Sequence, residues 1–556
     1  MMRFVIGLVV LAVPCAPVWA QEQGRAVTGK NGMVVCVSPE AADVGVAVLK
    51  QGGTAVDAAV AVAFAMAVTY PAAGNIGGGG FMLVAAHDAE PTVFDYRETA
   101  PGAVTRDTFA KTTDWHNHQG AGVPGTVRGL ELAHKRFGKL PWKDLVQPAI
   151  KLAEDGFALD GPMVKSLNDV VKRKTGNDEF RRVFGKDGGK TPWQAGDRLV
   201  QKDLAKTLRK IADEGPDAFY GGELANLLVA EMKAGGGFIA PGDLDAYRAK
   251  ERKPVHGTYR GYDVYGPPPP SSGGIGLVEM LSILEQFDLR AMGANSAEAR
   301  HVMAEAMRRA YADRARYLGD PDFVPVPEFL TSKEHARMLA KSIDLAKATP
   351  SESLADGIPL TKEGDHTTHF SIIDRDGMAV ANTYTLEDSY GSRVVVRGAG
   401  YILNNEMGDF NSRPGVTTRS GRIGTDPNLV APGKRMLSSM TPTVVRKGGK
   451  PVLVTGSPGG RTIINTVLCV VTNVIDFDMD VQSAVDSPRQ HHQWFPDVLQ
   501  VEVRDDAVVK KLEGLGHKVR TVPIKQGDAH SIWIDPKTGL YYGAADKRID
   551  GKAAGY

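Results

Sequence analysis

The residues whose types and spacing favour nucleophilic chemistry are two threonines on a predicted hairpin. The hairpin covers residues 366–387 and turns at 374–377, where Gly377 can adopt the left-handed conformation of a three-residue loop. In such a loop, residues whose numbers sum to about 752 face each other, which sets Thr367 opposite Thr385. Directly opposed residues have Cβ atoms about 5 Å apart, so the two hydroxyls could hydrogen-bond. Threonine pairs in sheets are usually structural, and this pair alone does not establish an active site.

Other patterns that suggest a bound group have simpler explanations. A glycine-rich run at 74–80 follows a predicted helix and precedes a predicted strand, whereas a dinucleotide-binding loop lies between a strand and the helix after it. The run more simply indicates close approach of another backbone or a ligand. His491 and His492, with Asp486 nearby, would point to opposite faces of a strand, and no third ligand has a recognisable spacing. We therefore expect a structural role for both histidines, and neither a cofactor nor a metal ion.

The composition is that of an ordinary globular protein. The chain has 556 residues, of which 42% are hydrophobic and 24% charged, so it can bury a sizeable core. Sixty-six Lys and Arg against 65 Asp and Glu leave a formal charge of +1, which gives no field to attract nucleic acid or an anionic membrane. The 3 cysteines exclude a disulfide scaffold and a cysteine-built metal site, and we expect Cys36 and Cys469 to be unbridged.

The first twenty residues have the pattern of a secretory signal peptide. Arg3 precedes an apolar run at 4–13, and small or apolar residues up to Ala20 suit a cleavage site. A membrane-spanning helix needs about 20 apolar residues, and prolines interrupt this run earlier. We therefore expect cleavage after Ala20, a mature chain that begins at Gln21 in the periplasm or outside the cell, and no stable membrane anchor. An uncleaved anchor is the alternative.

Helix and strand signals divide the chain unevenly. Ser38-Pro39-Glu40 indicates one helix start, and Thr54 with Asp57 indicates a second, which leads into an apolar core helix at 56–68. The pattern from 127 to 345 is mainly helical, and its helix at 297–317 should bury an apolar stripe and expose its charges. A strand is expected at 81–86. Strands should dominate the last third, at 367–373, 378–386, 443–446, 451–455 and 531–534, with a helix at 461–476.

Seven short motifs occur in a fixed order from about residue 30 to the end of the chain. They are Phe94-Asp95-Tyr96-Arg97-Glu98, Val123-Pro124-Gly125-Thr126, Asp365-His366-Thr367-Thr368-His369-Phe370-Ser371, Asn404-Asn405-Glu406-Met407-Gly408-Asp409-Phe410, Leu437-Ser438-Ser439-Met440-Thr441-Pro442, Gly456-Ser457-Pro458-Gly459-Gly460 and Ala553-Ala554-Gly555-Tyr556. Together they resemble the γ-glutamyltranspeptidases, which are members of the N-terminal nucleophile hydrolase superfamily. The third motif resembles the autoprocessing junction of that family.

The resemblance implies a precursor that cuts itself between His366 and Thr367. A large subunit, 21–366, and a small subunit, 367–556, would then form a heterodimer with one intertwined core. The implied fold is α+β, a four-layer αββα sandwich with a largely helical part in the large subunit. A threonine hydroxyl is a poor nucleophile without a base, but cleavage would give Thr367 a free α-amine with a reference pKa of about 7.7 to 8.0. Thr367 would then serve as both nucleophile and base.

The other site residues are implied by matching positions in the family motifs. Thr385 would hydrogen-bond the Thr367 hydroxyl, and the backbone N–H groups of Gly459 and Gly460 would bind the tetrahedral oxyanion. The substrate α-carboxylate would be held by Arg97, Ser438 and Ser439, and the α-ammonium by Glu406, Asp409 and Glu387.

Three positions depart from the family pattern. Glu387 stands where many members have asparagine, which adds a negative charge near the α-ammonium. Gly408 replaces a common aspartate, and Ser420, in the predicted lid at 413–424, replaces the gating tyrosine of some bacterial members. Asp409 is retained, and acylases of the family that take glutaryl substrates tend to lose this acid. Its presence therefore favours γ-glutamyl substrates.

We expect a self-processing γ-glutamyltransferase and glutathione hydrolase. The γ-glutamyl group of glutathione or another γ-glutamyl compound would form an ester with Thr367 and pass to water, an amino acid or a peptide. A related enzyme, either a glutaryl or cephalosporin acylase or a poly-γ-glutamate depolymerase, is one alternative. A secreted binding protein that keeps the fold without catalysis is the other.

Overall fold

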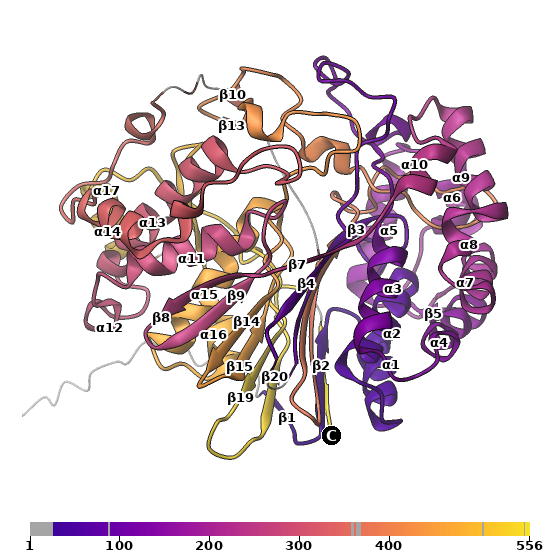
Figure 1. Ribbon diagram of the computed structural model, residues 1–556, viewed down its shortest axis with the longest axis horizontal. Helices are drawn as coiled ribbons and strands as arrows, with labels where there is room; N and C mark the ends of the chain where they lie inside the picture. The colour runs from indigo at the N-terminus through magenta and orange to yellow at the C-terminus, as the bar shows by residue number, and fades with distance from the viewer. Residues whose placement is uncertain are drawn as a thin grey trace, which may run out of the picture.

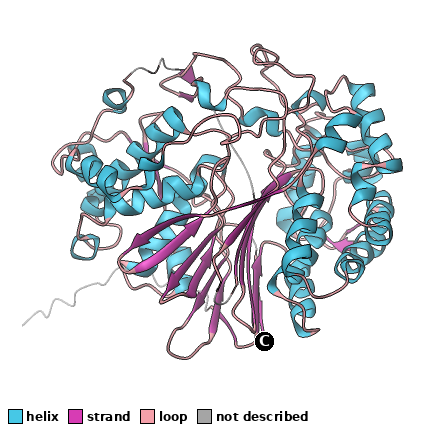
Figure 2. Cartoon of the chain, in the orientation of Figure 1, coloured by secondary structure: helices cyan, strands magenta, loops and turns pink. Residues whose placement is uncertain are grey.

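Two seven-stranded antiparallel sheets lie at the centre of the molecule (Figure 1). The first sheet consists, in order, of β21 (Lys552–Gly555), β2 (Gly32–Cys36), β11 (Thr368–Asp374), β12 (Ala379–Thr385), β3 (Gly79–Ala85), β4 (Thr92–Asp95) and β7 (Lys250–Arg252). The second consists of β1 (Val27–Gly29), β20 (Tyr541–Ala544), β19 (Ser531–Ile534), β15 (Lys450–Thr455), β14 (Thr443–Lys447), β9 (Tyr262–Gly266) and β8 (Val255–Tyr259). Helices cover the outer side of each sheet (Figure 2). The expected αββα sandwich is confirmed.

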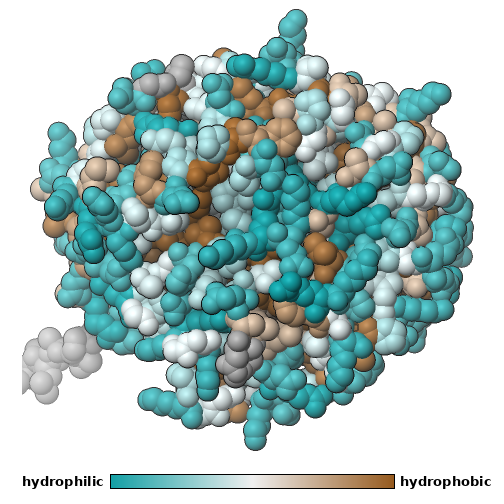
Figure 3. Space-filling view, viewed as in Figure 1, coloured by the Kyte–Doolittle hydropathy of each residue, from teal (hydrophilic) through white to brown (hydrophobic). Residues whose placement is uncertain are grey.

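The computed structural model describes residues 26–86, 89–356, 358, 361–362, 368–502, 505–549 and 551–556. The predicted signal peptide and the predicted cleavage point between His366 and Thr367 lie outside these residues. Within them, no helix combines the length and the apolar composition that a membrane crossing requires. On the face shown in Figure 3, hydrophilic residues cover most of the surface and hydrophobic residues form small patches between them.

The N-terminal helices pack against the first sheet. As predicted, α1 (Pro39–Lys50) is capped by Ser38, and α2 (Ala55–Thr69) begins with a capping box between Thr54 and Asp57. Every residue of α2 is buried, because β11 and β12 lie on one side of it and other helices lie around the rest. This side of the molecule also holds α3 (Thr126–Phe137), α4 (Trp142–Asp155), α5 (Gly161–Lys172), α6 (Asp178–Phe184), α7 (Lys202–Glu214), α8 (Asp217–Tyr220), α9 (Gly222–Gly235) and α10 (Pro241–Ala246).

A second group of helices covers the other sheet. It consists of α11 (Gly273–Leu284), α12 (Leu289–Met292), α13 (Ala297–Tyr317), α14 (Lys333–Lys341), α15 (Ile463–Ile475), α16 (Val481–Asp486) and α17 (Asp506–Gly514). The apolar stripe of α13 is buried, as predicted. The expectation that its charges are solvated is wrong, because neighbouring helices cover both faces of α13. Glu305, Arg308 and Arg309 are buried there and form ion pairs with one another.

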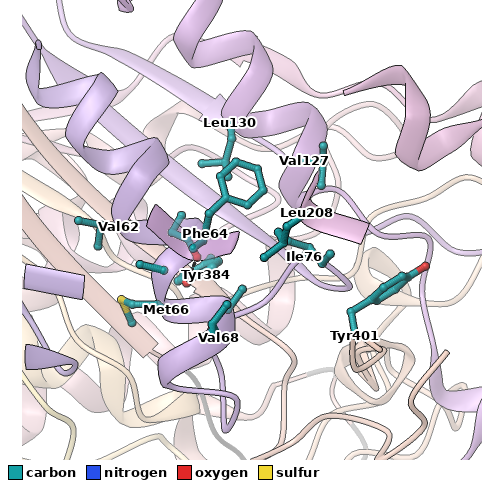
Figure 4. Close-up of a cluster of buried hydrophobic side chains, with 14 of the residues drawn as sticks. Val62, Phe64, Met66, Val68, Ile76, Val127, Leu130, Leu208, Tyr384 and Tyr401 are labelled. Carbon is teal, nitrogen blue, oxygen red and sulfur yellow. Dashed lines mark hydrogen bonds between the residues drawn. The ribbon is translucent and has the colours of Figure 1, made fainter. Parts of the chain in front are cut away.

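The period of two along the central strands divides the core into layers. In β2, Met33 and Val35 face the second sheet, whereas Val34 and Cys36 face the helices on the opposite side. Figure 4 shows the helix-facing core, where Tyr384 of β12 lies beside Phe64 of α2. Apolar burial on both faces is what anchors the central strands.

The hairpin of β11 and β12 has the predicted register. Six pairs, from Ile373 with Ala379 to Thr368 with Tyr384, all have residue numbers that sum to 752. Gly377 in the turn has a φ of 78°, which is the left-handed conformation that was predicted for it. The next pair in this register, Thr367 with Thr385, includes a residue outside the described part of the chain.

The expectation that the sheets lie mainly in the last third of the chain is wrong. Strands β1 to β4 and β7 to β9 come from the first half, and they supply seven of the fourteen strands of the two large sheets. Strands β7 and β8 are edge strands with many exposed or half-exposed residues, so their hydrophobic pattern is weak. The remaining short strands are β5 (Phe157–Ala158), β6 (Arg198–Leu199), β10 (Thr361–Lys362), β13 (Gly421–Arg422), β16 (Gln490–His491), β17 (Leu499–Val501) and β18 (Val519–Thr521).

Candidate active site

Asp374 fixes the turn of the central hairpin. Its carboxylate accepts hydrogen bonds from the backbone N–H groups of Asp376 and Met378, both at 3.0 Å. It also accepts one at 2.8 Å from the N–H of Ala55, which opens α2. The hairpin is therefore tied to the first helical layer, and a register fixed at the turn persists to the open end of the two strands.

Thr385 ends β12 at the open end of this hairpin. Its Oγ1 accepts a hydrogen bond from the backbone N–H of Glu387 at 2.8 Å, and its carbonyl accepts one from Nδ2 of Asn75, also at 2.8 Å. In the described part of the chain, no acceptor takes the hydroxyl proton of Thr385. The side chain is 1% exposed. A buried hydroxyl normally donates as well as accepts, so this proton is available to a group at the adjacent position of β11.

A pocket of about 370 Å³ opens near the end of the hairpin. Six of the ten predicted site residues line it, and they are Arg97, Glu387, Asp409, Ser438, Ser439 and Gly460. Three others lie directly behind these: Thr385 contacts Glu387, Glu406 contacts Arg97, and Gly459 precedes Gly460. The tenth, Thr367, lies outside the described residues. The structure thus brings together all nine predicted residues that it describes.

Arg97 is the centre of the charge network in this pocket. Its Nη1 lies 2.6 Å from Oε2 of Glu406, and its Nη2 pairs with Asp409. The Nε donates to the carbonyl of Met436 at 3.3 Å, and Glu98 lies 3.5 Å from Nη1. Arg97 therefore contacts the acids directly, whereas the sequence comparison assigned them to separate subsites for the carboxylate and the ammonium.

The pocket contains more carboxylates than Arg97 can neutralise. Burial raises the pKa of Glu98 to about 8, although Arg97 partly opposes this effect. Burial also raises the pKa of Glu406 well above its ordinary value, again against the effect of Arg97. The pKa of Glu387 is raised by burial and then by the charges of Asp409 and Glu406. One carboxylate oxygen from each of Glu387, Glu406 and Asp409 lies within 4.8 Å of the other two. An ammonium group bound among them would relieve this repulsion.

Ser438 and Ser439 form the opposite wall. The Oγ of Ser438 accepts from the N–H of Met440 at 3.0 Å, and Oγ of Ser439 accepts from Nη2 of Arg314 at 3.1 Å. Arg314 belongs to α13. It lines the pocket together with Arg422 and Arg461, which come from other segments. Arg422 lies in the predicted lid at 413–424, whereas Arg314 and Arg461 reach the pocket from segments outside the recognised motifs.

The loop that contains Gly459 and Gly460 follows β15 and precedes α15. Their φ angles are 126° and 53°, which L side chains rarely adopt. A Cβ at Gly459 would lie only 2.4 Å from Oγ1 of Thr462. Among the described residues, neither glycine N–H has an acceptor. Two unpaired N–H groups just before a helix N-terminus favour a developing negative charge.

The segment 413–424 lies over one side of the pocket, where Arg422 and Ile423 line it. Its short strand β13 pairs with β10, so that Arg422 lies opposite Thr361. Ser420 is not among the lining residues, and its hydroxyl contacts Thr418 at 3.5 Å. At the other departure, a Cβ on Gly408 would lie 3.4 Å from the ring of Trp115. The small residue at 408 thus lets this indole ring form part of the wall.

The two cysteines and the two adjacent histidines lie in buried structural surroundings. Cys36 and Cys469 are both free and buried, as expected. His491 bonds to Asn465 and Gln493, and His492 bonds to Asp497. Within the described residues, neither histidine belongs to a group of side chains that could hold a metal ion. These bonds support the structural role that was predicted for both.

Comparisons with known proteins agree with this geometry. Glutathione hydrolase proenzyme of Escherichia coli (strain K12) is 48% identical over 541 residues, which cover 95% of this chain and 93% of that protein. The crystal structure of cephalosporin acylase from Bacillus halodurans superimposes with a TM-score of 0.86 at 28% identity and covers 98% of this chain and 99% of that one. A chain of the γ-glutamyltranspeptidase of Helicobacter pylori is 41% identical, with a TM-score of 0.55, and covers 60% of this chain and 96% of its own length.

The family match extends over nearly the whole sequence. The family model described as gamma-glutamyltranspeptidase matches residues 41–556. This range includes both large sheets except β1 and β2, and every residue that lines the pocket. The chain belongs to the γ-glutamyltranspeptidase family.

Proposed function

We propose that this protein is a self-processing γ-glutamyltransferase and glutathione hydrolase. The observation that carries the proposal is the group of Glu387, Glu406 and Asp409 around Arg97, in a pocket beside the end of the hairpin. An α-amino acid head group brings one ammonium and one carboxylate. The ammonium binds among the three acids, and the carboxylate binds to Arg97 and the serine wall.

The chemistry takes place where the pocket meets the hairpin. The Thr367 hydroxyl attacks the γ-carbonyl carbon of the donor and passes its proton to the Thr367 α-amine. The backbone N–H groups of Gly459 and Gly460 stabilise the resulting oxyanion, and the Thr385 hydroxyl donates a hydrogen bond to the nucleophile oxygen without transferring its proton. The C–N bond then breaks, the leaving amine takes the proton from the α-ammonium, and a γ-glutamyl ester remains on Thr367. Water or an acceptor amine releases the group by the same steps in reverse.

Cleavage between His366 and Thr367 supplies the α-amine in this scheme. The large subunit, 21–366, would contain 346 of the 556 residues, or 62%. The Helicobacter pylori chain, which is matched over 96% of its length, covers a similar share of this chain, 60%. The two subunits would remain associated through the first sheet, in which β11 and β12 of the small subunit lie between β2 and β3 of the large one. Residues 1–20 would direct export to the periplasm or the medium and would be removed from the mature protein.

A denaturing gel tests processing and catalysis together. The wild-type protein should give two bands and the Thr367→Ala variant one band. One intact wild-type band after long incubation would refute the enzyme proposal and favour the binding protein.

A pair of chromogenic anilides tests the substrate class. The γ-glutamyl anilide should be cleaved much faster than the glutaryl anilide, which lacks the α-ammonium. Asp409→Asn should greatly reduce cleavage of the first and barely change the second. Faster cleavage of the glutaryl compound by the wild type would favour the acylase alternative, which the likeness to a cephalosporin acylase keeps open.

A further inference from the structure

Three helices over the second sheet bring two acids and one imidazole together outside the pocket. Glu279 lies on α11, Asp313 on α13 and His335 on α14, and α11 packs against both other helices (Figure 1). One ligand atom from each of the three side chains lies within 4.8 Å of the other two. Nε2 of His335 is 2.8 Å from Oδ2 of Asp313. None of the three residues lines the pocket.

One carboxyl oxygen of Glu279 lacks the partner that a buried carboxyl group requires. It is 1% exposed, and its Oε1 has no hydrogen-bond partner among the described residues. One turn further along α11, Ser282 is equally buried, and its hydroxyl is also unpartnered in the described chain. Leaving such groups unsatisfied is costly. The neighbouring Asp313 adds a second negative charge, which Arg316 at 3.6 Å partly balances. Burial and this charge raise the pKa of Glu279 well above its ordinary value. A cation between the two acids would remove both penalties.

A second cluster, of His301, Glu305 and His517, shows how a buried carboxylate is satisfied without an ion. Both carboxylate oxygens of Glu305 are bound, by Arg308 at 3.2 Å and by Arg309 at 2.6 Å. His301 bonds through Nδ1 to His517 and through Nε2 to the carbonyl of Asp344, both at 2.8 Å. In that cluster the carboxylate is therefore satisfied by two arginines, and the ligand atom without a hydrogen-bond partner among the described residues is Nδ1 of His517. In the Glu279 cluster, by contrast, the atom without a hydrogen-bond partner among the described residues is a carboxyl oxygen, Oε1 of the most buried acid.

The chemistry of the donors selects the class of cation. An imidazole nitrogen with carboxylate oxygens suits Zn²⁺ and related transition metals, whereas Ca²⁺ and Mg²⁺ prefer oxygen ligands alone. Three protein ligands leave one tetrahedral position for water. The side chains of His335 and Asp313 are 10% and 9% exposed, so the cluster is open to solvent on one side.

We propose that Glu279, Asp313 and His335 bind one divalent transition-metal ion that joins α11, α13 and α14. The ion would also steady the pocket wall. Arg314, which directly follows Asp313, bonds to Ser272 at 2.9 Å and to Ser439 at 3.1 Å. No metal-binding spacing marks this site in the sequence, because its ligands come from three helices.

Metal binding by the processed full-length protein tests the proposal, with Zn²⁺ as the probe. The protein is dialysed against a chelator and then titrated with Zn²⁺, and bound zinc is measured by mass spectrometry. We expect one Zn²⁺ per chain and, at a free concentration 100 times Kd, a rise in Tm of about 3 °C. Millimolar Ca²⁺ should not raise Tm. Binding of less than one-tenth of an equivalent of Zn²⁺ by the wild type would overturn the proposal.

Glu279→Gln keeps the shape of the side chain and removes its charge. We expect Zn²⁺ affinity to fall at least tenfold, while Tm of the metal-free protein stays the same or rises. His256→Gln is the matched control, since His256 lies 2.9 Å from Asp263 in an exposed pair on the edge of the second sheet. It should bind Zn²⁺ like the wild type. Equal binding by the wild type and Glu279→Gln would show that zinc binds elsewhere and that the two acids share a proton instead.

His335→Gln gives a second test that does not depend on the core residue. The wild type with Co²⁺ in place of Zn²⁺ should show the visible absorption of a site with a nitrogen ligand, and His335→Gln should lose it. An unchanged cobalt spectrum in this variant would refute the assignment of the imidazole ligand.

Discussion

Replacing Thr385 with valine removes one hydroxyl and keeps the shape of the side chain. In the structure that hydroxyl accepts the backbone N–H of Glu387 at 2.8 Å, and its own proton has no acceptor among the described residues. If this hydroxyl donates a hydrogen bond to the nucleophile oxygen of Thr367, the variant should lower both the free energy of unfolding and kcat. The two effects have different causes, so each has its own expected size.

The stability effect comes from the orphaned N–H of Glu387. A buried donor left without an acceptor costs about 1–3 kcal/mol in the free energy of unfolding. The rate effect comes from the lost bond to an oxygen that carries negative charge as it reacts. Hydrogen bonds to charged groups contribute about 1.5–3 kcal/mol, which corresponds to a fall in kcat of about 10- to 150-fold.

The assay is release of a chromogenic amine from a γ-glutamyl anilide, with kcat normalised to the fraction of cleaved protein on a denaturing gel. Thr383→Val is the matched control, because Thr383 lies on the same face of β12 and its Oγ1 makes one buried bond, to Nδ1 of His369 at 2.8 Å. Both variants should lose similar stability. Thr385→Val with a kcat within threefold of Thr383→Val would refute the catalytic role of Thr385 and leave the hydroxyl a structural one.

Two further predictions concern the oxyanion loop and the response to acid. Gly459→Ala should lower kcat about 100-fold or more with little change in KM, because a Cβ displaces the loop, and the loss of one oxyanion donor costs about this much. Gly449→Ala, at a left-handed turn with open space around it, should keep wild-type kcat, and equal losses in both variants would refute the assignment. Burial lowers the pKa of His491 and His492 to about 4, below the ordinary value of 6.5. The unfolded chain therefore binds more protons between pH 6.5 and 4, and by pH 4 the free energy of unfolding should have fallen by about 3 kcal/mol for each histidine. Urea unfolding at several pH values in this range gives the free energy of unfolding as a function of pH. This free energy should change less steeply with pH for His491→Gln than for the wild type, and equal pH dependence would contradict the reasoning.

Local signals were sufficient to predict the elements with clear local chemistry. Ser38 and the Thr54–Asp57 capping box mark helix starts through bonds within one turn, so sequence alone locates them. The register of the hairpin follows from a single turn, because each later pair is fixed by the one before. Edge strands β7 and β8 were missed for the opposite reason, since half-exposed residues carry little hydrophobic period.

The candidate site was predictable only as a set of residues and not as a geometry. Motif order identified Arg97, Glu406 and Asp409, but nothing in their spacing shows that the two acids pair with the arginine. The buried charges of α13 and the pocket position of Arg314 were missed because helical periodicity describes a helix alone. Which faces become covered depends on neighbours that are remote in sequence.

Glu387 links substrate recognition to the reacting end of the hairpin. Its backbone N–H donates a hydrogen bond to Oγ1 of Thr385, and its carboxylate lies close to those of Glu406 and Asp409. Its φ is 77°, a left-handed conformation that costs a side chain like glutamate about 1–2 kcal/mol and that asparagine adopts more easily. The asparagine of many relatives would thus fit this backbone with less strain and without the added charge. Glutamate at 387 has two costs, backbone strain and the partial burial of a carboxylate, and a bound ammonium would offset the second. In the proposed site, a change at 387 would alter substrate binding and would also reach Thr385 through one hydrogen bond.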